Sequence, residues 1–343
     1  MSKALTTVGA RKISRRGLFT IAGAALTPVP LAACEKETAE PTFPAHEVRL
    51  MVPAEEGGGW DMTARSMQEA LTDARVIDQE VMVYNIEGDA GINALQELVA
   101  NYHSDAHELM VMGVVMMGGV VVNESSVNLA QVTPIATLTS EDEILVVSAS
   151  SPYSTIDDVV SQIKTDPTTV TWGGGSRGGI DQILIGDILK HAGLEPKLAD
   201  EMYEANSGGA GSIDDILNGS IDVAVSGVSE YADLLKTGEL RGLAVSGAKP
   251  VEIADITVPT LRDESYDIEL TNWRGVVAPP GIAAHEYEGL NKVIDDLHKS
   301  AEWKKVLSEK GWTDFYRTGD DLKEFFASEA ERVSESLRDL ELA

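Results

Sequence analysis

Short apolar runs alternate with longer segments of helical periodicity along most of the chain. Because strand, helix and strand in repeated succession are typical of a parallel sheet covered by helices, this order predicts an α/β fold. The clearest helical stripe lies near the end of the chain, where apolar residues recur at three- and four-residue spacing from Leu322 to Leu340. The expected strands are 47–52, 80–84, 108–113, 143–149 and 169–172, and the expected helices are 61–75, 92–101, 155–165 and 179–191.

Two triple-glycine loops interrupt this pattern, and each stands between an expected strand and an expected helix. They are Gly57-Gly58-Gly59 and Gly173-Gly174-Gly175. A glycine backbone after a strand can bring its N–H groups, and the positive end of the next helix, onto an anion. Asp61 follows the first loop where a helix should begin, so we expect it to be the N-cap.

Three further loops of small residues cover 87–91, 113–119 and 207–212. In open α/β sheets the ligand lies beyond the carboxyl ends of the strands. We therefore expect these loops and the two triple-glycine loops to converge on one crevice that binds an anion.

The first 33 residues have the features of an export signal. Arg15 and Arg16 form a twin-arginine pattern, and the apolar stretch behind them is short for a membrane span. That stretch ends at Cys34, the only cysteine, in a Leu-Ala-Ala-Cys sequence that resembles a bacterial lipobox. We expect residues 1–33 to be a signal peptide that is removed, Cys34 to carry lipid, and residues 34–45 to be a polar tether.

Acidic residues outnumber basic ones along the whole chain, with 56 Asp and Glu against 27 Lys and Arg and a net charge of −29. Such a surface repels nucleic acid and anionic lipid, so we expect no nucleic-acid partner and membrane contact only through the lipid on Cys34. An acidic composition of this kind is typical of proteins kept soluble in high salt.

The second triple-glycine loop also permits two catalytic interpretations. Residues 173–178 match the dinucleotide fingerprint, but nicotinamide cofactors are not normally available to an exported protein. Residues 174–178 match the nucleophile elbow of hydrolases, with Ser176 as the nucleophile and His285 or His298 as the histidine that must follow. An exported serine hydrolase is therefore the alternative function.

The best metal-like cluster combines His103 and His107 with Asp105 and Glu108. Histidines four residues apart can share one helix face and bind zinc. This cluster, however, falls in the polar turn before an expected strand, where such residues are commonly solvated. We expect neither a metal nor a cofactor, and anion binding by the glycine loops is the interpretation that remains.

Several motifs, in order along the chain, resemble one family of receptors. The sequence is similar to the extracytoplasmic solute-binding receptors of tripartite tricarboxylate transporters over residues 46–340, essentially the whole chain after the signal and tether. The segments that carry the resemblance are 48–53, 58–61, 88–91, 172–179, 238–245 and 273–281.

The resemblance implies a two-lobed periplasmic-binding-protein fold of the type II kind, each lobe a mostly parallel sheet flanked by helices. Lobe I would comprise residues 46–140 plus 270–343, and lobe II residues 141–269, with the ligand in the cleft between them. The implied function is a periplasmic, lipid-anchored receptor, not an enzyme. It would bind a small organic carboxylate, a di- or tricarboxylate such as citrate, and deliver it to membrane permease subunits.

The resemblance also implies which residues bind the carboxylate, largely through backbone N–H groups. One wall would be formed by Gly57, Gly58, Gly59, Trp60, Gly88, Ala90 and Gly91, and the other by Gly174, Gly175, Ser176 and Arg177.

Charged residues near these loops complicate that picture. Arg177 is the preferred counter-charge, since it lies in the loop itself, ahead of Arg65, Arg241 and Arg274. Three acids, Glu55, Glu56 and Asp89, depart from the family pattern. They would repel an anion unless they point outward, sit in high salt, or hold a cation that the ligand chelates.

Overall fold

The computed structural model describes residues 43–206 and 208–343, apart from the side chain of Ala210. The expected signal peptide, Cys34 and most of the tether lie outside the described residues. Within the described part of the chain, no helix is long and apolar enough to cross a membrane.

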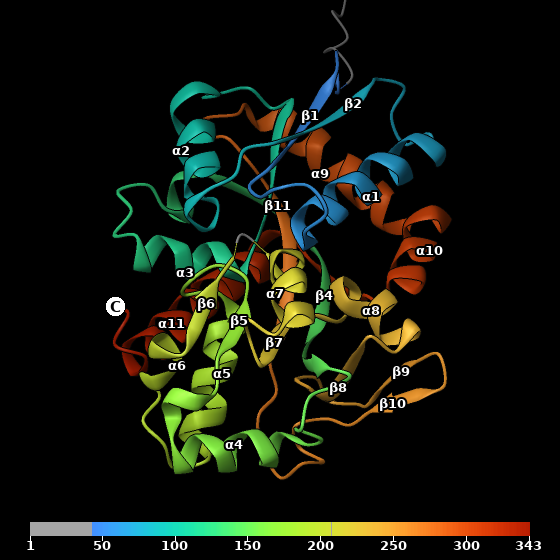
Figure 1. The fold of residues 1–343 in the computed structure, drawn as a ribbon. Coiled ribbons are helices and arrows are strands. Elements are labelled where there is room, and N and C mark those ends of the chain that lie inside the picture. Colours follow the sequence, from blue (N-terminus) through green and yellow to red (C-terminus); the bar gives the residue numbers. More distant parts are fainter. Residues whose placement is uncertain (1–42, 207) are drawn as a thin grey trace, which may run out of the picture. The chain divides into compact units, whose positions relative to one another are not determined.

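One region of the sheet gathers strands from both ends of the described chain (Figure 1). β1, β2 and β3 are parallel, while β11 runs antiparallel to β3 and β4 antiparallel to β11. These strands are β1 (Val48–Val52), β2 (Val81–Asn85), β3 (Glu108–Gly113), β4 (Thr133–Ser148), β11 (Thr271–Ala278) and β12 (Thr313–Arg317), the last of which pairs with β4. The helices that accompany them are α1 (Gly59–Asp73), α2 (Ile92–Asn101), α3 (Val114–Val122), α9 (Ala284–Lys299), α10 (Ala301–Lys310) and α11 (Gly319–Asp339).

The second region of the sheet is built from the middle of the chain. Its parallel strands are β5 (Trp172–Gly174), β6 (Tyr203–Ala205) and β7 (Val223–Gly227), and β8 (Leu240–Val245) pairs with β4. Its helices are α4 (Ile156–Thr165), α5 (Ile180–His191), α6 (Leu198–Glu201), α7 (Ile213–Asn218) and α8 (Val228–Thr237), and a separate hairpin joins β9 (Val251–Ile253) to β10 (Ile256–Val258).

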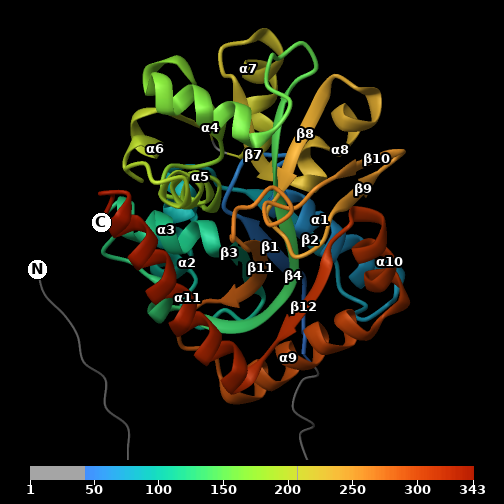
Figure 2. The same ribbon diagram turned by 90° about the horizontal axis from the view of Figure 1, so that it is seen from below.

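β4 belongs to both regions of the sheet (Figure 2). Up to Asp142 it pairs with β11 and β12, and from Glu143 onward it pairs with β7 and β8. The chain returns beside this point, because the N–H of Leu270 donates to the carbonyl of Ser246 and Thr271 pairs with Asp142. Two crossings between the regions therefore lie side by side.

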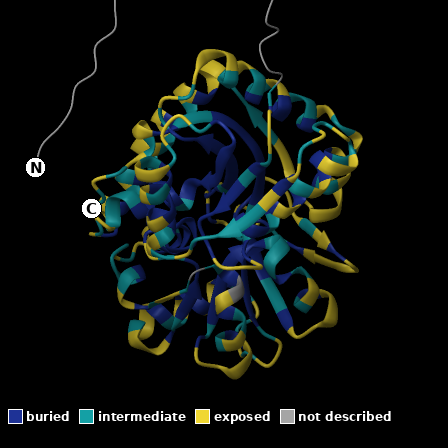
Figure 3. Cartoon of the chain, turned by 90° about the horizontal axis from the view of Figure 1, so that it is seen from above, coloured by how far each residue is buried: buried dark blue, intermediate teal, exposed yellow. Residues whose placement is uncertain are grey.

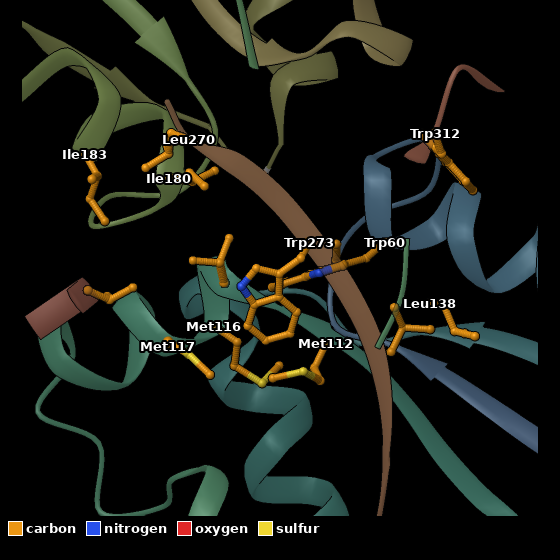
Figure 4. Close-up of a cluster of buried hydrophobic side chains, with 14 of the residues drawn as sticks. Trp60, Met112, Met116, Met117, Leu138, Ile180, Ile183, Leu270, Trp273 and Trp312 are labelled. Carbon is orange, nitrogen blue, oxygen red and sulfur yellow. The ribbon is translucent and has the colours of Figure 1, made fainter. Parts of the chain in front are cut away.

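Buried residues gather on the strands and on the inner faces of the helices (Figure 3). The larger apolar cluster includes side chains of both sheet regions, for example Trp273 of β11 and Ile180 of α5 (Figure 4). Burying a side chain of this size contributes about 1.5–3 kcal/mol. This shared core places the loops at the ends of β1 and β5 near each other.

The structure confirms the α/β order and every expected element, with shifts at several boundaries. Four expectations are wrong. Residues 113–119 are not a loop, because Val114–Val122 form α3; the strand expected at 143–149 is only the second half of β4; and the strand expected at 169–172 begins at Trp172. Asp61 is not an N-cap, since α1 begins at Gly59 and Gly58 is its N-cap.

Candidate ligand-binding site

The first glycine loop leads from β1 into α1 without a side chain that caps the helix. Asp61 instead supports the loop: it accepts hydrogen bonds from the N–H of Gly57 at 2.9 Å, Nε of Arg65 at 2.8 Å and Nδ2 of Asn85 at 3.0 Å. Although burial opposes it, these donors hold the pKa of Asp61 below its ordinary value. The first-turn N–H groups of α1 have no partner within the helix and can therefore receive an anion.

The second glycine loop is held in a similar way at the start of α5. Oδ2 of Asp181 accepts from the N–H of Gly175 at 2.5 Å, and Oε1 of Gln182 accepts from the N–H of Gly178 at 2.7 Å. Both helices begin with the same pattern, since Gly58-Gly59-Trp60-Asp61 matches Gly178-Gly179-Ile180-Asp181 in three of four positions.

Two glycines of α3 let other loops come close to this helix. A Cβ on Gly118 would collide with the carbonyl of Gly178, and a Cβ on Gly119 would meet Ala90 at 2.7 Å. The loop that contains Ala90 has positive φ at four consecutive residues, 88–91, including two that are not glycine. Two adjacent glycines of α3 therefore contact the second glycine loop and the 88–91 loop.

Two adjoining cavities lie among these loops, and both are lined by Ala54 and Ser176. The first cavity has a volume of about 50 Å³, and Gly58, Gly59, Trp60 and Gly175 contribute to its wall. The second has a volume of about 360 Å³, and Gly88, Asp89, Ala90, Gly91 and Arg177 contribute to its wall.

Nine of the eleven expected binding residues therefore line one cavity or the other, and two do not. Gly57 is exposed with φ of +91° and donates its N–H to Asp61, and Gly174 is buried within β5. Trp60 contributes to the first cavity but is largely buried, and it lies among Met112, Met116 and Trp273 in Figure 4.

Two arginines line the cavities, Arg274 the first and Arg177 the second. Arg177 turns to Asp200, to which Nε and Nη2 donate at 2.7 and 2.8 Å, and its side chain is 51% exposed. Arg274 of β11 lines the first cavity with a side chain only 2% exposed and forms an ion pair with Glu141. A Cβ on Gly59 would collide with this guanidinium, so the glycine gives Arg274 access to the loop.

Acidic side chains are concentrated below the first cavity, where the chain crosses between the sheet regions. Glu141 accepts from the N–H and Oγ of Ser229, at 3.1 and 2.7 Å, at the start of α8. Glu143, fully buried, accepts from Nδ2 of Asn272 at 2.9 Å. Burial, together with the neighbouring carboxylate of Asp181, raises the pKa of Glu143 well above its ordinary value.

Of the three acids expected to disturb an anion site, Glu55 and Glu56 line neither cavity, whereas Asp89 lines the second. Glu55, Glu56 and Asp89 are exposed, and Glu56 pairs with Arg65 at 3.4 Å.

The metal-like cluster is engaged in other contacts. Arg49 pairs with Glu108 at 2.6 Å and with Asp105 at 3.2 Å, and the ring of His107 accepts from the N–H of Ala45 at 3.0 Å. Within residues 43–206 and 208–343, no group of three or more His, Cys, Asp or Glu is arranged to hold a metal ion.

Sequence reasoning missed several cavity residues, among them Asp181, Ser226, Glu230 and Asn272. They come from α5, β7, α8 and β11, and only the fold brings them together. The repeated Gly-Gly-x-Asp pattern was the one local signal that could have identified Asp181.

Comparison with known proteins gives one family. Residues 63–342 match the model of the tripartite tricarboxylate transporter family receptor. A UPF0065 protein of Agrobacterium vitis is 26% identical over 259 residues, which cover 75% of this chain and 72% of that protein.

Solved structures agree on the fold. The periplasmic binding protein BugD superposes with a TM-score of 0.76 at 17% identity, covering 88% of this chain and 99% of BugD. An R. palustris protein solved with adipate superposes with a TM-score of 0.78 at 22% identity, covering 87% of this chain and 98% of that one. The chain therefore has the α/β periplasmic-binding-protein fold.

Proposed function

This chain belongs to the tripartite tricarboxylate transporter receptor family, and we propose that it is the extracytoplasmic receptor for a small organic carboxylate, which it delivers to the membrane permease subunits of such a transporter. As a solute-binding receptor of this family it is not an enzyme.

The observation that carries the proposal is the placement of the two glycine loops. Both precede helices whose N-cap is a glycine with no capping side chain, and residues of both loops line the first cavity beside Arg274. Backbone N–H groups, a helix N-terminus and a guanidinium are the groups that bind carboxylates in proteins. The relative solved with adipate supports a di- or tricarboxylate as the ligand.

We propose that two lobes close over this ligand. Lobe I comprises residues 46–140 plus 270–343 and lobe II residues 141–269. The side-by-side crossings, where β4 changes partners after Asp142 and the chain returns at Leu270, are the hinge. Ser176 would meet the ligand from lobe II and Gly59 from lobe I.

We also propose that the receptor is exported by the twin-arginine route and anchored to the outer face of the cytoplasmic membrane through lipid on Cys34. Fractionation of cells that express Cys34→Ala tests this. The variant should leave the membrane for the soluble periplasmic fraction, and unchanged membrane association would contradict the anchor.

The hydrolase alternative finds no support in the residues around Ser176. Ser176 lines both cavities, but no histidine among the described residues does. His298 lies against Asp314 and stacks on Tyr316 instead.

A thermal-shift panel of small carboxylates tests the receptor function. Succinate, adipate, citrate and their hydroxy and amino analogues should include at least one compound that raises the melting temperature in a concentration-dependent way. A flat response to the whole panel by purified, ligand-stripped protein would contradict the proposal.

A further inference from the structure

The first cavity has an acidic side that a simple dicarboxylate does not explain. Asp181 and Glu230 both line it, with Asp181 only 5% exposed, and Glu143 lies next to Asp181. Oε1 of Glu230 accepts from Oγ of Ser226 at 3.2 Å. These carboxyl groups come from three separate elements, so their convergence is a product of the fold.

A buried donor in the same cavity points independently to a ligand. Nη1 of Arg274 has no hydrogen-bond partner among the described residues, although the side chain is only 2% exposed. An unpaired guanidinium N–H is costly to bury. A ligand carboxylate in the first cavity would satisfy it.

The charges around the cavity limit which other groups of the ligand can lie in it. Among the described residues that line the first cavity, Arg274 is the one cation, and it faces Glu141, Asp181 and Glu230. Burial raises the pKa of Asp181 as well as that of Glu143. A second carboxylate next to Asp181 and Glu230 would be repelled in a site with little water. An ammonium or hydroxyl group there would donate to the carboxylates.

The sizes of the two cavities indicate which part of the ligand each of them can hold. About 50 Å³ holds a small polar end, whereas the adjoining cavity of about 360 Å³, with the 88–91 loop and Arg177, can hold the rest. A second ligand carboxylate would lie there, joined to the first end past Ala54 and Ser176.

Resting on the proposed function, we infer that the ligand is a dicarboxylate with a donor group beside one carboxylate: Arg274 binds that carboxylate, and Asp181 with Glu230 bind an adjacent ammonium or hydroxyl. The receptor thus selects amino or hydroxy dicarboxylates over plain ones.

Three four-carbon dicarboxylates that differ only at one position test the inference. Calorimetric titration of ligand-stripped receptor at neutral pH should give affinities in the order aspartate, malate, succinate, with aspartate at least tenfold tighter than succinate. Succinate binding as tightly as aspartate would overturn the inference.

Two charge-neutralising variants test the residues. Asp181→Asn keeps an acceptor for the N–H of Gly175, and Glu230→Gln keeps one for Ser226. Either should reduce the preference for aspartate over succinate to less than threefold without weakening succinate. Glu56→Gln removes an equal charge from an exposed site and should leave the preference unchanged.

The outcomes separate this inference from the proposed function. If adipate or citrate binds while aspartate and malate do not, the donor-group inference is wrong and the receptor function stands. If both neutralised variants keep the wild-type preference for aspartate over succinate, Asp181 and Glu230 are not the residues that bind the donor group. If no carboxylate binds, the proposed function fails and the inference fails with it.

Discussion

Arg274 connects the parts of the site at the scale of single residues. It pairs with Glu141, lies close to Gly59 and lines the first cavity, and its Nη1 is buried without a hydrogen-bond partner among the described residues. Its position on β11, opposite Thr139 of β4, fixes it next to the point where the chain crosses between sheet regions. We propose that this buried arginine both stabilises the fold and binds the ligand.

Arg274→Met should destabilise the protein by about 3 kcal/mol, because it leaves Glu141 buried without its cation. The double variant Arg274→Met with Glu141→Leu should recover most of that loss. Urea denaturation measures both free energies of unfolding. A single variant as stable as wild type would contradict the importance of this ion pair.

Asp142 lies at the same crossing, next to other acidic side chains. Burial and then the nearby Glu141 and Glu269 raise its pKa from 3.8 to about 6. A carboxyl group with a raised pKa in the folded protein favours folding when protonated, so stability falls as pH rises from about 4 through 6.

Asp142→Asn should therefore stabilise the protein above pH 6 by about 1 kcal/mol, discounted for partial solvation, and this gain should vanish near pH 4. Denaturation curves of wild type and variant at both pH values check the sign. A gain at pH 4 that equals the gain at pH 7 would contradict the account.

The site residues that can be predicted from the sequence belong to short local motifs, whereas the missed ones do not. The triple glycines and Ser176 are visible as short patterns after a strand. Glu230 and Asn272 are ordinary polar residues in the sequence, and only the fold brings them from α8 and β11 into the wall of one cavity. The loop position of Arg177 makes it the preferred counter-charge in the sequence, whereas Arg274 lies on a strand and carries no such local signal; in the fold Arg177 lines the second cavity and pairs with Asp200.

At the scale of elements, α3 and β4 decide the geometry of the site. α3 was mistaken for a loop because Gly113, Gly118 and Gly119 are typical of turns. In the helix, two of these glycines permit close packing of loops that carry cavity residues. The first half of β4 was missed because Pro134 and several Thr and Ser residues interrupt its apolar pattern.

Gly118→Ala tests this role of α3. An alanine in a helix is ordinarily favoured over glycine by about 1 kcal/mol. Here its Cβ would meet the carbonyl of Gly178, so we expect a net loss of about 1–2 kcal/mol and weaker carboxylate binding. Ser161→Ala, on the exposed face of α4, is the control and should change neither quantity.

At the scale of the whole molecule, the two proposed lobes share one strand, β4. β4 and the return near Leu270 are the crossings, and Asn272 and Arg274, which follow that return on β11, line the first cavity. A ligand that contacts loops of both lobes favours the closed arrangement by the difference in its affinity for the two states.

Small-angle X-ray scattering should then show a smaller radius of gyration when the receptor is saturated with a dicarboxylate that raises its melting temperature. Identical scattering curves with and without that compound would contradict lobe closure.

The most direct test of the carboxylate site compares two adjacent glycines by calorimetric titration with the same dicarboxylate. Gly59→Ala places a Cβ in the space of the Arg274 guanidinium, whereas a Cβ on Gly58 has no neighbour closer than 3.9 Å. The account predicts saturable binding to wild type, a loss of at least tenfold in affinity for Gly59→Ala, and a clearly smaller loss for Gly58→Ala. Absence of binding to wild type, or equal affinity in wild type and Gly59→Ala, would contradict it.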